Sequence, residues 1–496
     1  MPKVELTLVW SKRIFRAILP LVAIVPLFNA ACYGSAFSIA ELGARASGMG
    51  TAFIATADDG SAIFYNPAGI AFQPGRHMQM DSLVVVGLFR FTPSSVPEGQ
   101  VIPPNGYSGS VKPHFIPVAA LYATQQYNDK ITLGFGAFTP FGLAANFTNF
   151  NDSDPALTKF PGRFAGTRAE LQEYWFQPTI AYKITPNMAF AVGPAFVHTH
   201  LLIEQSILNP SGSDGLTFGD AAASTFFPNL PQGQAAAILA RLLPEGVSRL
   251  AGTANEFGYA GGWLYKNPGS KTRVGAMFRS AVTNHLTGKA SFAFDGVTPI
   301  ESYLPPNFLY NAFPNQSIKG SFTTPATYGV GVANSKFWNG TTFAADVRIQ
   351  DYHRFASVPI NFPINSSQNA DIATPPEQRL VFDFHYSANL AFGMEKPIND
   401  SMTVRLGYLY DKSPVPDQSV GPLFPDANRN SFTVGASKTR GDKEYTFFYE
   451  AMFFENRVTN VAANANQYTN GDYHSFAHLF GLSLRFNLGD TITIKH

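Results

Sequence analysis

Charged residues are scarce in this chain. Lys, Arg, Asp and Glu make up only 14% of its 496 residues, against roughly 25% in ordinary soluble domains. Aromatic residues also reach 14%, with 45 Phe and 20 Tyr, so a soluble fold of this composition would expose an unusually apolar surface. The composition therefore disfavours a water-soluble globular protein.

Long hydrophobic runs are absent as well. The mean hydropathy is −0.02, and after residue 36 no uninterrupted apolar stretch approaches the roughly 18 residues that a membrane-spanning helix needs. Apolar surface without apolar runs is typical of a transmembrane β-barrel, in which only alternate residues of each strand face lipid. The sequence thus predicts an all-β transmembrane barrel.

Several chemical signatures are missing too. Cys32 is the only cysteine, and removal of an N-terminal leader containing it would leave a chain without disulfides. There is no G-x-S-x-G elbow or metal-ligand spacing, so neither enzymatic activity nor a metal or other cofactor is expected. His198 and His200 are interpreted as ordinary wall residues. No basic patch accompanies the aromatic residues, which argues against nucleic acid as a partner.

Residues 1–36 have the pattern of a signal peptide. A basic segment precedes a short apolar run at residues 17–28, and Gly34-Ser35-Ala36 offers small residues for cleavage. The alternatives are a membrane anchor, for which the run is short, and a lipoprotein acylated on Cys32, for which residues 29–31 lack an aliphatic residue. We therefore expect an exported protein.

Residues 37–78 are expected to form a small helical hatch inside the barrel. Small side chains crowd this segment, so it can pack closely against a wall but cannot build a core of its own. Asp58 and Asp59 are predicted to cap a short helix, which Asn66-Pro67 would end. Such a segment needs an enclosure.

Residues 79–490 would supply that enclosure as the barrel, with a C-terminal tail at residues 491–496. Six short connections with tight-turn residues alternate with seven long, irregular ones. Outer-membrane barrels combine short periplasmic turns with long extracellular loops and an even strand count, which predicts about fourteen antiparallel strands. The predicted strands begin near Gln79, Phe115, Lys130, Arg168, Asn187, Glu256, Lys271, Gly320, Gly340, Leu380, Ser401, Arg429, Asp442 and Tyr473.

Charges in these segments fall on one face. In the strand from Ser401, Arg405 and Asp411 alternate with apolar residues such as Leu406 and Tyr410. An arginine facing lipid at mid-depth would cost roughly 2 to 4 kcal/mol, so the charged face is expected to point into the lumen. A soluble β-sandwich, which also alternates, is the remaining alternative.

The run GARASGMGTAFIATADDGSAIFYNPAGIAF at residues 43–72 resembles the N-terminal hatch of the FadL/TodX family of outer-membrane transporters for hydrophobic compounds. The segment RLGYLYDKSPVPDQSVGPLFPDANR at residues 405–429 is similar to the same family in its spacing. The resemblance implies a fourteen-stranded, plugged barrel in the outer membrane of a Gram-negative-type bacterium. Its expected cargo is long-chain fatty acids, or alternatively aromatic hydrocarbons, taken up by diffusion.

The resemblance also implies a route for the cargo. Phe37 would touch an inner apolar pocket, and Asn66, Pro67 and Ala68 would hold the hatch near the wall. We expect a shift of the hatch at Phe37 to Ile39 to weaken the pocket, so that ligand leaves sideways through a kinked third strand.

That kink can be sought in the sequence itself. Pro140 lacks an N–H and Gly142 tolerates unusual φ, which predicts a break in the hydrogen-bond ladder. Alternatively, Pro140 ends the strand. The expected gap comprises Thr139, Pro140, Phe141, Gly142 and Leu143.

Two further residue sets are candidates for ligand contact. A long connection carries an apolar segment that would form a capture site or merely pack on neighbouring loops. Arg279 and Arg405 could pair with a carboxylate head group, or belong to internal charge networks with Asp346 or Asp411. The capture segment comprises Phe226, Phe227, Ile238, Leu239, Leu242 and Leu243. The expected partners are hydrophobic small molecules and outer-membrane lipid, the expected state is a monomer, and the competing function is a porin or adhesin.

Overall fold

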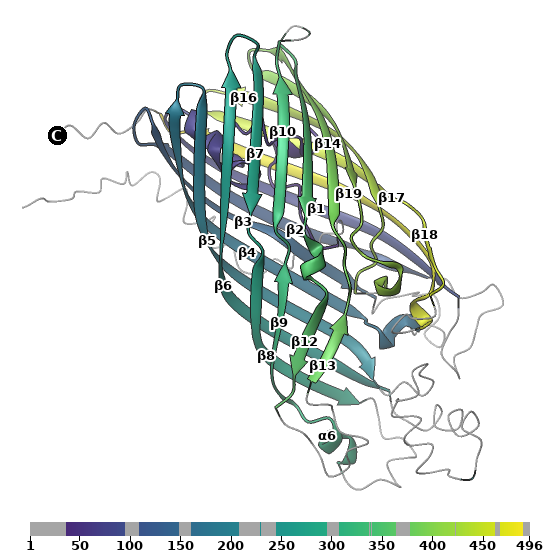
Figure 1. Ribbon diagram of the computed structural model, residues 1–496. Helices are drawn as coiled ribbons and strands as arrows, with labels where there is room; N and C mark the ends of the chain where they lie inside the picture. Colours follow the sequence, from purple (N-terminus) through teal and green to yellow (C-terminus); the bar gives the residue numbers. More distant parts are fainter. Residues whose placement is uncertain are drawn as a thin grey trace, which may run out of the picture.

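The protein is described by a computed structural model that closes into a single β-barrel (Figure 1). The described residues are 36–94, 109–147, 160–207, 229, 245–294, 307–336, 338, 340–363, 377–421, 423–461 and 467–489. One sheet holds nineteen strands, and it closes because β1 (Arg76–Pro93) pairs with both β2 (Gly109–Gln126) and β19 (Gly471–Asn487). Every pairing is antiparallel, which confirms the predicted fold class. No helix among these residues is long and apolar enough to span a bilayer.

The nineteen strands occupy fourteen positions in the wall. Nine positions hold one strand each: β1, β2, β3 (Ile131–Asn146), β4 (Arg168–Thr185), β5 (Met188–Ile207), β6 (Gly246–Asn267), β15 (Met402–Asp411), β16 (Arg429–Arg440) and β19. Five positions hold two consecutive strands: β7 (Thr272–Arg279) with β8 (Val282–Phe294), β9 (Gln316–Thr324) with β10 (Thr327–Asn334), β11 (Thr342–Gln350) with β12 (Ser357–Asn361), β13 (Glu377–Val381) with β14 (Ser387–Asn399), and β17 (Lys443–Phe454) with β18 (Arg457–Thr459). The count from connection lengths is thereby confirmed.

Some strands are longer than the sequence predicted. β1 begins at Arg76, three residues before Gln79, and β6 begins at Gly246 rather than at Glu256. The early part of β6 was missed because its pattern is reversed: Leu250 is buried while polar side chains face outward. Polar residues on the outside and apolar residues on the inside are expected where the barrel wall extends beyond the lipid into water.

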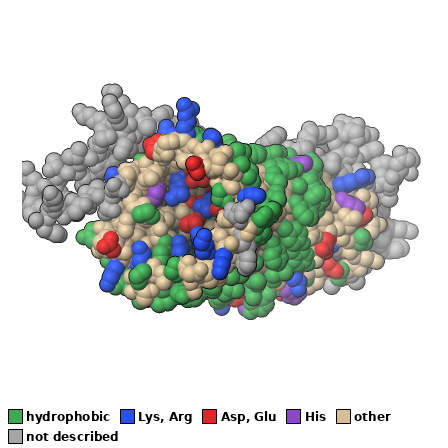
Figure 2. All heavy atoms as spheres, turned by 90° about the horizontal axis from the view of Figure 1, so that it is seen from above, with side chains coloured by type: hydrophobic (Ala, Val, Ile, Leu, Met, Phe, Trp, Pro, Cys, Tyr) green, Lys and Arg blue, Asp and Glu red, His purple; other side chains and the backbone are tan. Residues whose placement is uncertain are grey.

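Outward-facing apolar side chains form a band around the wall (Figure 2). On the face seen there, the band lies between a mouth where charged side chains gather and a second polar end. Inward positions carry the charges: Arg279 and Asp411 are 2% and 1% exposed, whereas Phe392 is 52% exposed. The predicted segregation of charge to the lumen is therefore confirmed.

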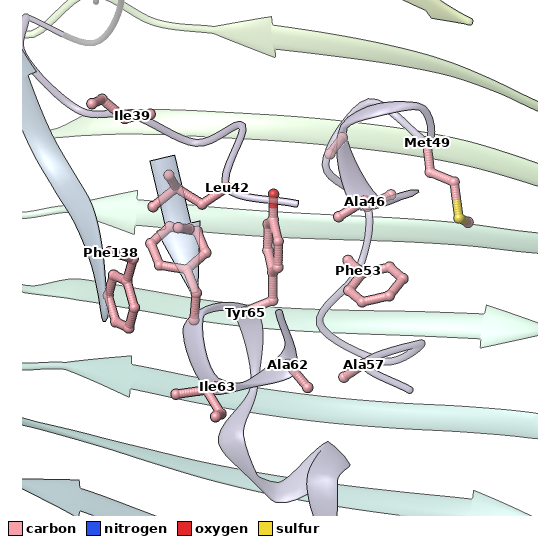
Figure 3. Packing of buried hydrophobic residues seen from close by; sticks show 14 of the residues in the cluster. Ile39, Leu42, Ala46, Met49, Phe53, Ala57, Ala62, Ile63, Tyr65 and Phe138 are labelled. Atoms are coloured by element: carbon pink, nitrogen blue, oxygen red, sulfur yellow. The ribbon is translucent and has the colours of Figure 1, made fainter. Parts of the chain in front are cut away.

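The hatch lies inside the barrel at the end with the short turns (Figure 1, purple). Its elements are α2 (Ala44–Ser47), α3 (Ala62–Tyr65) and the 3-10 helix η1 (Pro67–Phe72). Figure 3 shows Leu42, Phe53, Ile63 and Tyr65 packed together with Phe138 of the wall. A second buried cluster, rich in phenylalanine, fills the lumen toward the long connections.

Short helices lie between strands in the connections. They are η2 (Pro161–Phe164), α6 (Phe308–Ala312), η4 (Tyr352–Arg354), η5 (Asp417–Ser419) and η6 (Gln467–Thr469). Of these, η4 is important for the site because it joins β11 to β12 and turns its aromatic residues into the lumen.

Glycines line the wall where the hatch touches it. A Cβ at Gly407 would lie 2.0 Å from the backbone nitrogen of Gly50, and one at Gly262 would lie 2.2 Å from Asn66 Oδ1. No side chain fits at such distances, so the backbone of the hatch lies directly against Gly407 and the Asn66 side chain lies directly against Gly262. Wall glycines with similar hatch contacts are Gly275, Gly329, Gly393 and Gly435.

Candidate functional site

Ion pairs fix the hatch to the wall near the short turns. Arg45 Nε and Nη2 each lie 2.7 Å from one carboxylate oxygen of Glu395, and Arg45 Nη1 lies 2.6 Å from Asp58 Oδ1. Arg273 of β7 reaches the other oxygen of Asp58 at 2.9 Å. Burial alone would raise the pKa of Asp58, but Arg45 and Arg273 hold it well below its usual range. The predicted helix-capping role of Asp58 is wrong, whereas Asp59 Oδ1 does accept from Ser61 N just before α3.

Asn66 joins the hatch to the wall by its amide group. Its Nδ2 donates to the carbonyl of Ile54 at 2.8 Å and to that of Trp263, in β6, at 3.0 Å. Its Oδ1 accepts from Ala68 N at 3.2 Å, which sets the start of η1 at Pro67. The three residues for which the resemblance implied a position near the wall thus lie against β6.

We expect Asn66→Ala to loosen the hatch. Two buried carbonyls would lose their donor, which costs about 1 to 3 kcal/mol per unsatisfied group. Thermal unfolding of the purified protein in detergent measures the effect. Asn267→Ala, in an exposed turn where Asn267 Oδ1 accepts from Gly269 N, is the matched control, and equal losses in the two variants would contradict a role for Asn66 in seating the hatch.

The ladder between β2 and β3 stops early. Only Leu121 to Gln126 of β2 pair with β3, and among the described residues β3 beyond Phe138 pairs with β4 alone in the sheet. The β3–β4 register shifts between Phe138 and Phe141. Because β3 then continues to Asn146, the alternative that Pro140 ends the strand is wrong.

The free edge of β3 is occupied by the first residues of the hatch. Ser38 forms an isolated bridge with Phe141, Ile39 N donates to Pro140 O at 2.9 Å, and Gly142 N donates to Phe37 O at 2.7 Å. Residues 37–39 therefore take the place of a neighbouring strand. They are the same residues for which the sequence suggested movement.

At residue 142 the absence of a side chain leaves room for Ile39 of the hatch. Its φ lies outside the left-handed region, so the expected unusual conformation is wrong. A Cβ at this position would instead lie 2.9 Å from Ile39 Cδ1. A side chain at residue 142 would therefore press on the end of the Ile39 side chain.

Phe37 lies at the centre of an aromatic cluster and is fully buried. Its ring centroid is 5.9 Å from that of Phe141, 5.1 Å from Tyr352, 5.0 Å from Phe355 and 6.1 Å from Phe424. The last three residues were missed by sequence reasoning because they lie in connections, where no alternation marks them. The segment 405–429 of the resemblance contains Phe424 and was the one available signal.

Two small cavities adjoin Phe37's neighbours. One, of about 20 Å³, lies between Ile39, Pro140 and the side chains of Arg279 and Arg348, and has room for about one water. The other, also about 20 Å³, is entirely apolar in its exposed lining and runs past Leu143. Larger cargo requires the aromatic cluster to move.

Of the two predicted head-group residues, Arg279 lines the cavity beside the hatch. Its Nη2 donates to Phe64 O at 2.7 Å, and its guanidinium lies 4.3 Å from the centroid of the Phe64 ring. Arg405 instead pairs with Glu395 at 2.7 Å, at the base of the hatch. Arg348, which alternation placed in the lumen without singling it out, lines the same cavity as Arg279.

The alternative of an internal charge network is confirmed for Arg405, but its partner is Glu395 rather than Asp346 or Asp411. Asp346 Oδ2 accepts from the backbone nitrogens of Phe53 and Ile54 at 2.6 and 2.8 Å. Asp411 pairs with Arg429. Asp346 thus binds the backbone of the hatch, and Asp411 forms an ion pair with Arg429.

Some predicted segments lie outside the described residues. They are the capture segment with Phe226, Phe227, Ile238, Leu239, Leu242 and Leu243, nearly all of the signal peptide at 1–36, and the tail at 491–496.

Comparison with known proteins identifies the family of the chain. Residues 27–488 match the model of the family described as outer membrane protein transport protein (OMPP1/FadL/TodX). The chain belongs to the FadL/TodX family. This FadL/TodX-family protein is therefore an outer-membrane transport protein for hydrophobic compounds, and a channel rather than an enzyme.

Its similarities to individual proteins are distant but long. It is 24% identical over 419 residues to an outer membrane protein of Neisseria meningitidis serogroup B, covering 82% of this chain and 83% of that one. It is 23% identical over 418 residues to the 47 kDa outer membrane protein of Pasteurella multocida, covering 81% of this chain and 83% of that one. Among solved structures, a Pseudomonas aeruginosa FadL homologue superposes with a TM-score of 0.73 at 15% identity, covering 92% and 100%. The P. putida toluene transporter TodX superposes with a TM-score of 0.60 at 18% identity, covering 87% of this chain and 94% of that one.

Proposed function

We propose that the cargo is a long-chain fatty acid or a similar hydrophobic carboxylic acid. The observation that carries this proposal is the pair Arg279 and Arg348, which line one cavity beside the hatch. Both are buried, and neither forms an ion pair with a carboxylate among the described residues. A buried guanidinium that no carboxylate contacts directly is costly, and a ligand carboxylate would offset that cost through charge-assisted hydrogen bonds.

The apolar tail of such a cargo would lie in the phenylalanine-rich cluster. The second cavity leads from Leu143 past Phe355 and Phe424, and burial of apolar surface there contributes about 25 cal/mol per Å². The polar cavity at Arg279 and the apolar cavity both adjoin β3, at Phe141 and Leu143 respectively. An amphiphile with one charged end matches that arrangement.

Release is proposed to occur sideways, where β3 lacks a β2 partner. Residues 37–39 hold the free edge of β3 by the hydrogen bonds from Ile39 N and Gly142 N. A shift of these residues would break both bonds and withdraw Phe37 from its cluster at the same time. Capture of the cargo by the long connections would precede this release step. The whole route lies within one barrel, so a monomer is sufficient for transport.

An aromatic hydrocarbon is the second candidate cargo, because the rings around Phe37 would stack on it. A general porin is disfavoured by the hatch, which fills the lumen near the short turns. Liposome swelling distinguishes these functions. Fatty-acid uptake without sugar flux supports the transporter, and rapid sugar flux would refute it.

Arg279→Met is expected to reduce uptake of a long-chain fatty acid about 10- to 100-fold, since hydrogen bonds to charged groups contribute about 1.5 to 3 kcal/mol. Uptake of toluene should change far less. Paired uptake assays in cells that express equal amounts of folded protein measure both. Arg279→Lys keeps the charge and should recover part of the loss; an equal fall for both cargoes would count against a head-group role.

A further inference from the structure

An apolar groove of about 660 Å³ lies on the outer face of the barrel. It crosses β10, β11, β14 and β15 close to their short-turn ends, on the opposite side of the wall from the hatch. Nothing in the transport route uses it. Its exposed lining is almost wholly apolar, and the residues that shape it are Val332, Phe343, Ala345, Phe392, Leu406 and Tyr408.

The strand register explains the groove. Ala345 of β11 lies directly between Val332 of β10 and Phe392 of β14, and Phe343 stands two residues away on the same face. These three larger neighbours are 46%, 52% and 40% exposed, so they project outward while alanine does not. Ala345 therefore forms a floor between larger side chains.

Cations and an aromatic ring lie at the short-turn end of the groove. Lys396 is two residues beyond Met394, which lines the groove, and its Nζ lies 4.5 Å from the ring centroid of Trp338. Trp338 is 60% exposed, and Lys336, also exposed, lies two residues after the end of β10 at Asn334. Among the described residues neither lysine has an ion pair. Trp and Lys in this arrangement are typical of the membrane–water interface.

We propose that this groove is a binding site for an anionic phospholipid of the leaflet nearest the short turns. One acyl chain would lie over Ala345, and the phosphate would contact Lys336 and Lys396. The charge complementarity and the position within the apolar band both favour a lipid over a second protein copy, whose surface would have to match the two unpaired cations as well as the groove.

The site has a structural consequence, because the same strands seat the hatch. A Cβ at Gly393 would lie 2.6 Å from Met49 O, and one at Gly407 would lie 2.0 Å from Gly50 N, both on the lumen side. Phe392 and Leu406, the preceding residues, line the groove on the outer side. A bound lipid would therefore contact the same strands against which the hatch rests.

Native mass spectrometry of the purified full chain, supplied with equal phosphatidylglycerol and phosphatidylcholine, tests the proposal. We expect phosphatidylglycerol to be retained preferentially on the folded protein. Because a near-surface lysine contributes about fivefold to anionic-lipid affinity, the double variant Lys336→Gln and Lys396→Gln should lose about 25-fold. The charge-matched control, Lys130→Gln with Lys443→Gln at short turns away from the groove, should retain the preference. Equal retention of phosphatidylglycerol by the two double variants would overturn the site.

A second variant tests the groove rather than the charges. Ala345→Phe fills the floor and should lower retention of both lipids, whereas Ala451→Phe, at an outward position of β17, should not. Binding is counted per folded molecule, so poor assembly of a variant does not obscure the result. Unchanged retention by Ala345→Phe would show that the lysines attract lipid without a groove and would refute the proposed site.

Discussion

Gly142→Leu is expected to reduce uptake to background while leaving the barrel assembled. A Cβ at residue 142 would lie 2.9 Å from Ile39 Cδ1, so a leucine would occupy the space through which the proposed route leaves the lumen. The barrel ladder itself is unaffected, because Gly142 pairs with Gln172 of β4 through backbone atoms. Overpacking at such a site costs about 1 to 3 kcal/mol, which the large wall tolerates. Uptake assays, with folding judged by heat-modifiable mobility on gels, measure the result.

The matched control is Ala137→Leu on the same strand. Ala137 faces outward and pairs with both β2 and β4, so added bulk there meets lipid and uptake should remain normal. Normal uptake in Gly142→Leu as well would rule out an exit at this position. The proposal of a fatty-acid cargo would survive that outcome, since it depends on Arg279.

Arg45→Met is expected to destabilise the seated hatch by about 1.5 to 3 kcal/mol, the contribution of a hydrogen bond to a charged group, because each carboxylate retains a second arginine. Arg45 is the common partner of Glu395 and Asp58, and its side chain is 15% exposed. In the variant, Glu395 would still form its ion pair with Arg405, and Asp58 would still form its ion pair with Arg273. Protease sensitivity of residues 37–75 in the purified protein measures the seating.

Arg45→Lys distinguishes charge from geometry. A lysine keeps the positive charge but cannot contact both oxygens of Glu395, so it should recover only part of the loss. If Arg45→Met proved as protease-resistant as the unmodified protein, the ion pairs would have no role in seating the hatch.

The same ion pairs predict how the hatch responds to acid. The pKa of Asp58 in the folded protein is depressed, so its stabilising contribution is fully present above the unfolded value of about 3.9 and is lost as pH falls through the lower folded value. Asp58 by itself therefore causes no change in the protease resistance of the hatch between neutral pH and about pH 5. A loss between pH 7 and 5 would mean that another group controls it.

Most of the fold could be predicted from the sequence, because a lipid-facing wall enforces alternation. The strand from Ser401 and its neighbours needed only that pattern and the turn residues. The pieces of the shared positions that lie farthest from the short turns, such as β8, β9 and β12, could not be told apart from their neighbours along the chain in this way. They lie beyond the apolar band, where outward residues are polar and the contrast between the two faces weakens or reverses, as it does around Leu250.

The site was only partly predictable. Asn66 could be placed through the resemblance, and Arg279 through its inward position on a strand. The partners of Phe37 could not, because Tyr352 and Phe355 lie in a turn that brings them into the lumen. Arg405 shows the limit of the method: alternation sets the direction of a side chain but not its depth in the barrel, and depth decides whether it meets cargo or Glu395.

The glycine contacts divide the plug into an anchored body and a movable tip. Around Gly50 and Asn66 the main chain rests directly on the wall, with no rotamer that could swing aside to let it tilt. The tip at residues 37–39 is held by two hydrogen bonds and by rings that can turn. A cargo arriving among those rings would therefore displace the tip alone, and the membrane would stay sealed to water during each passage.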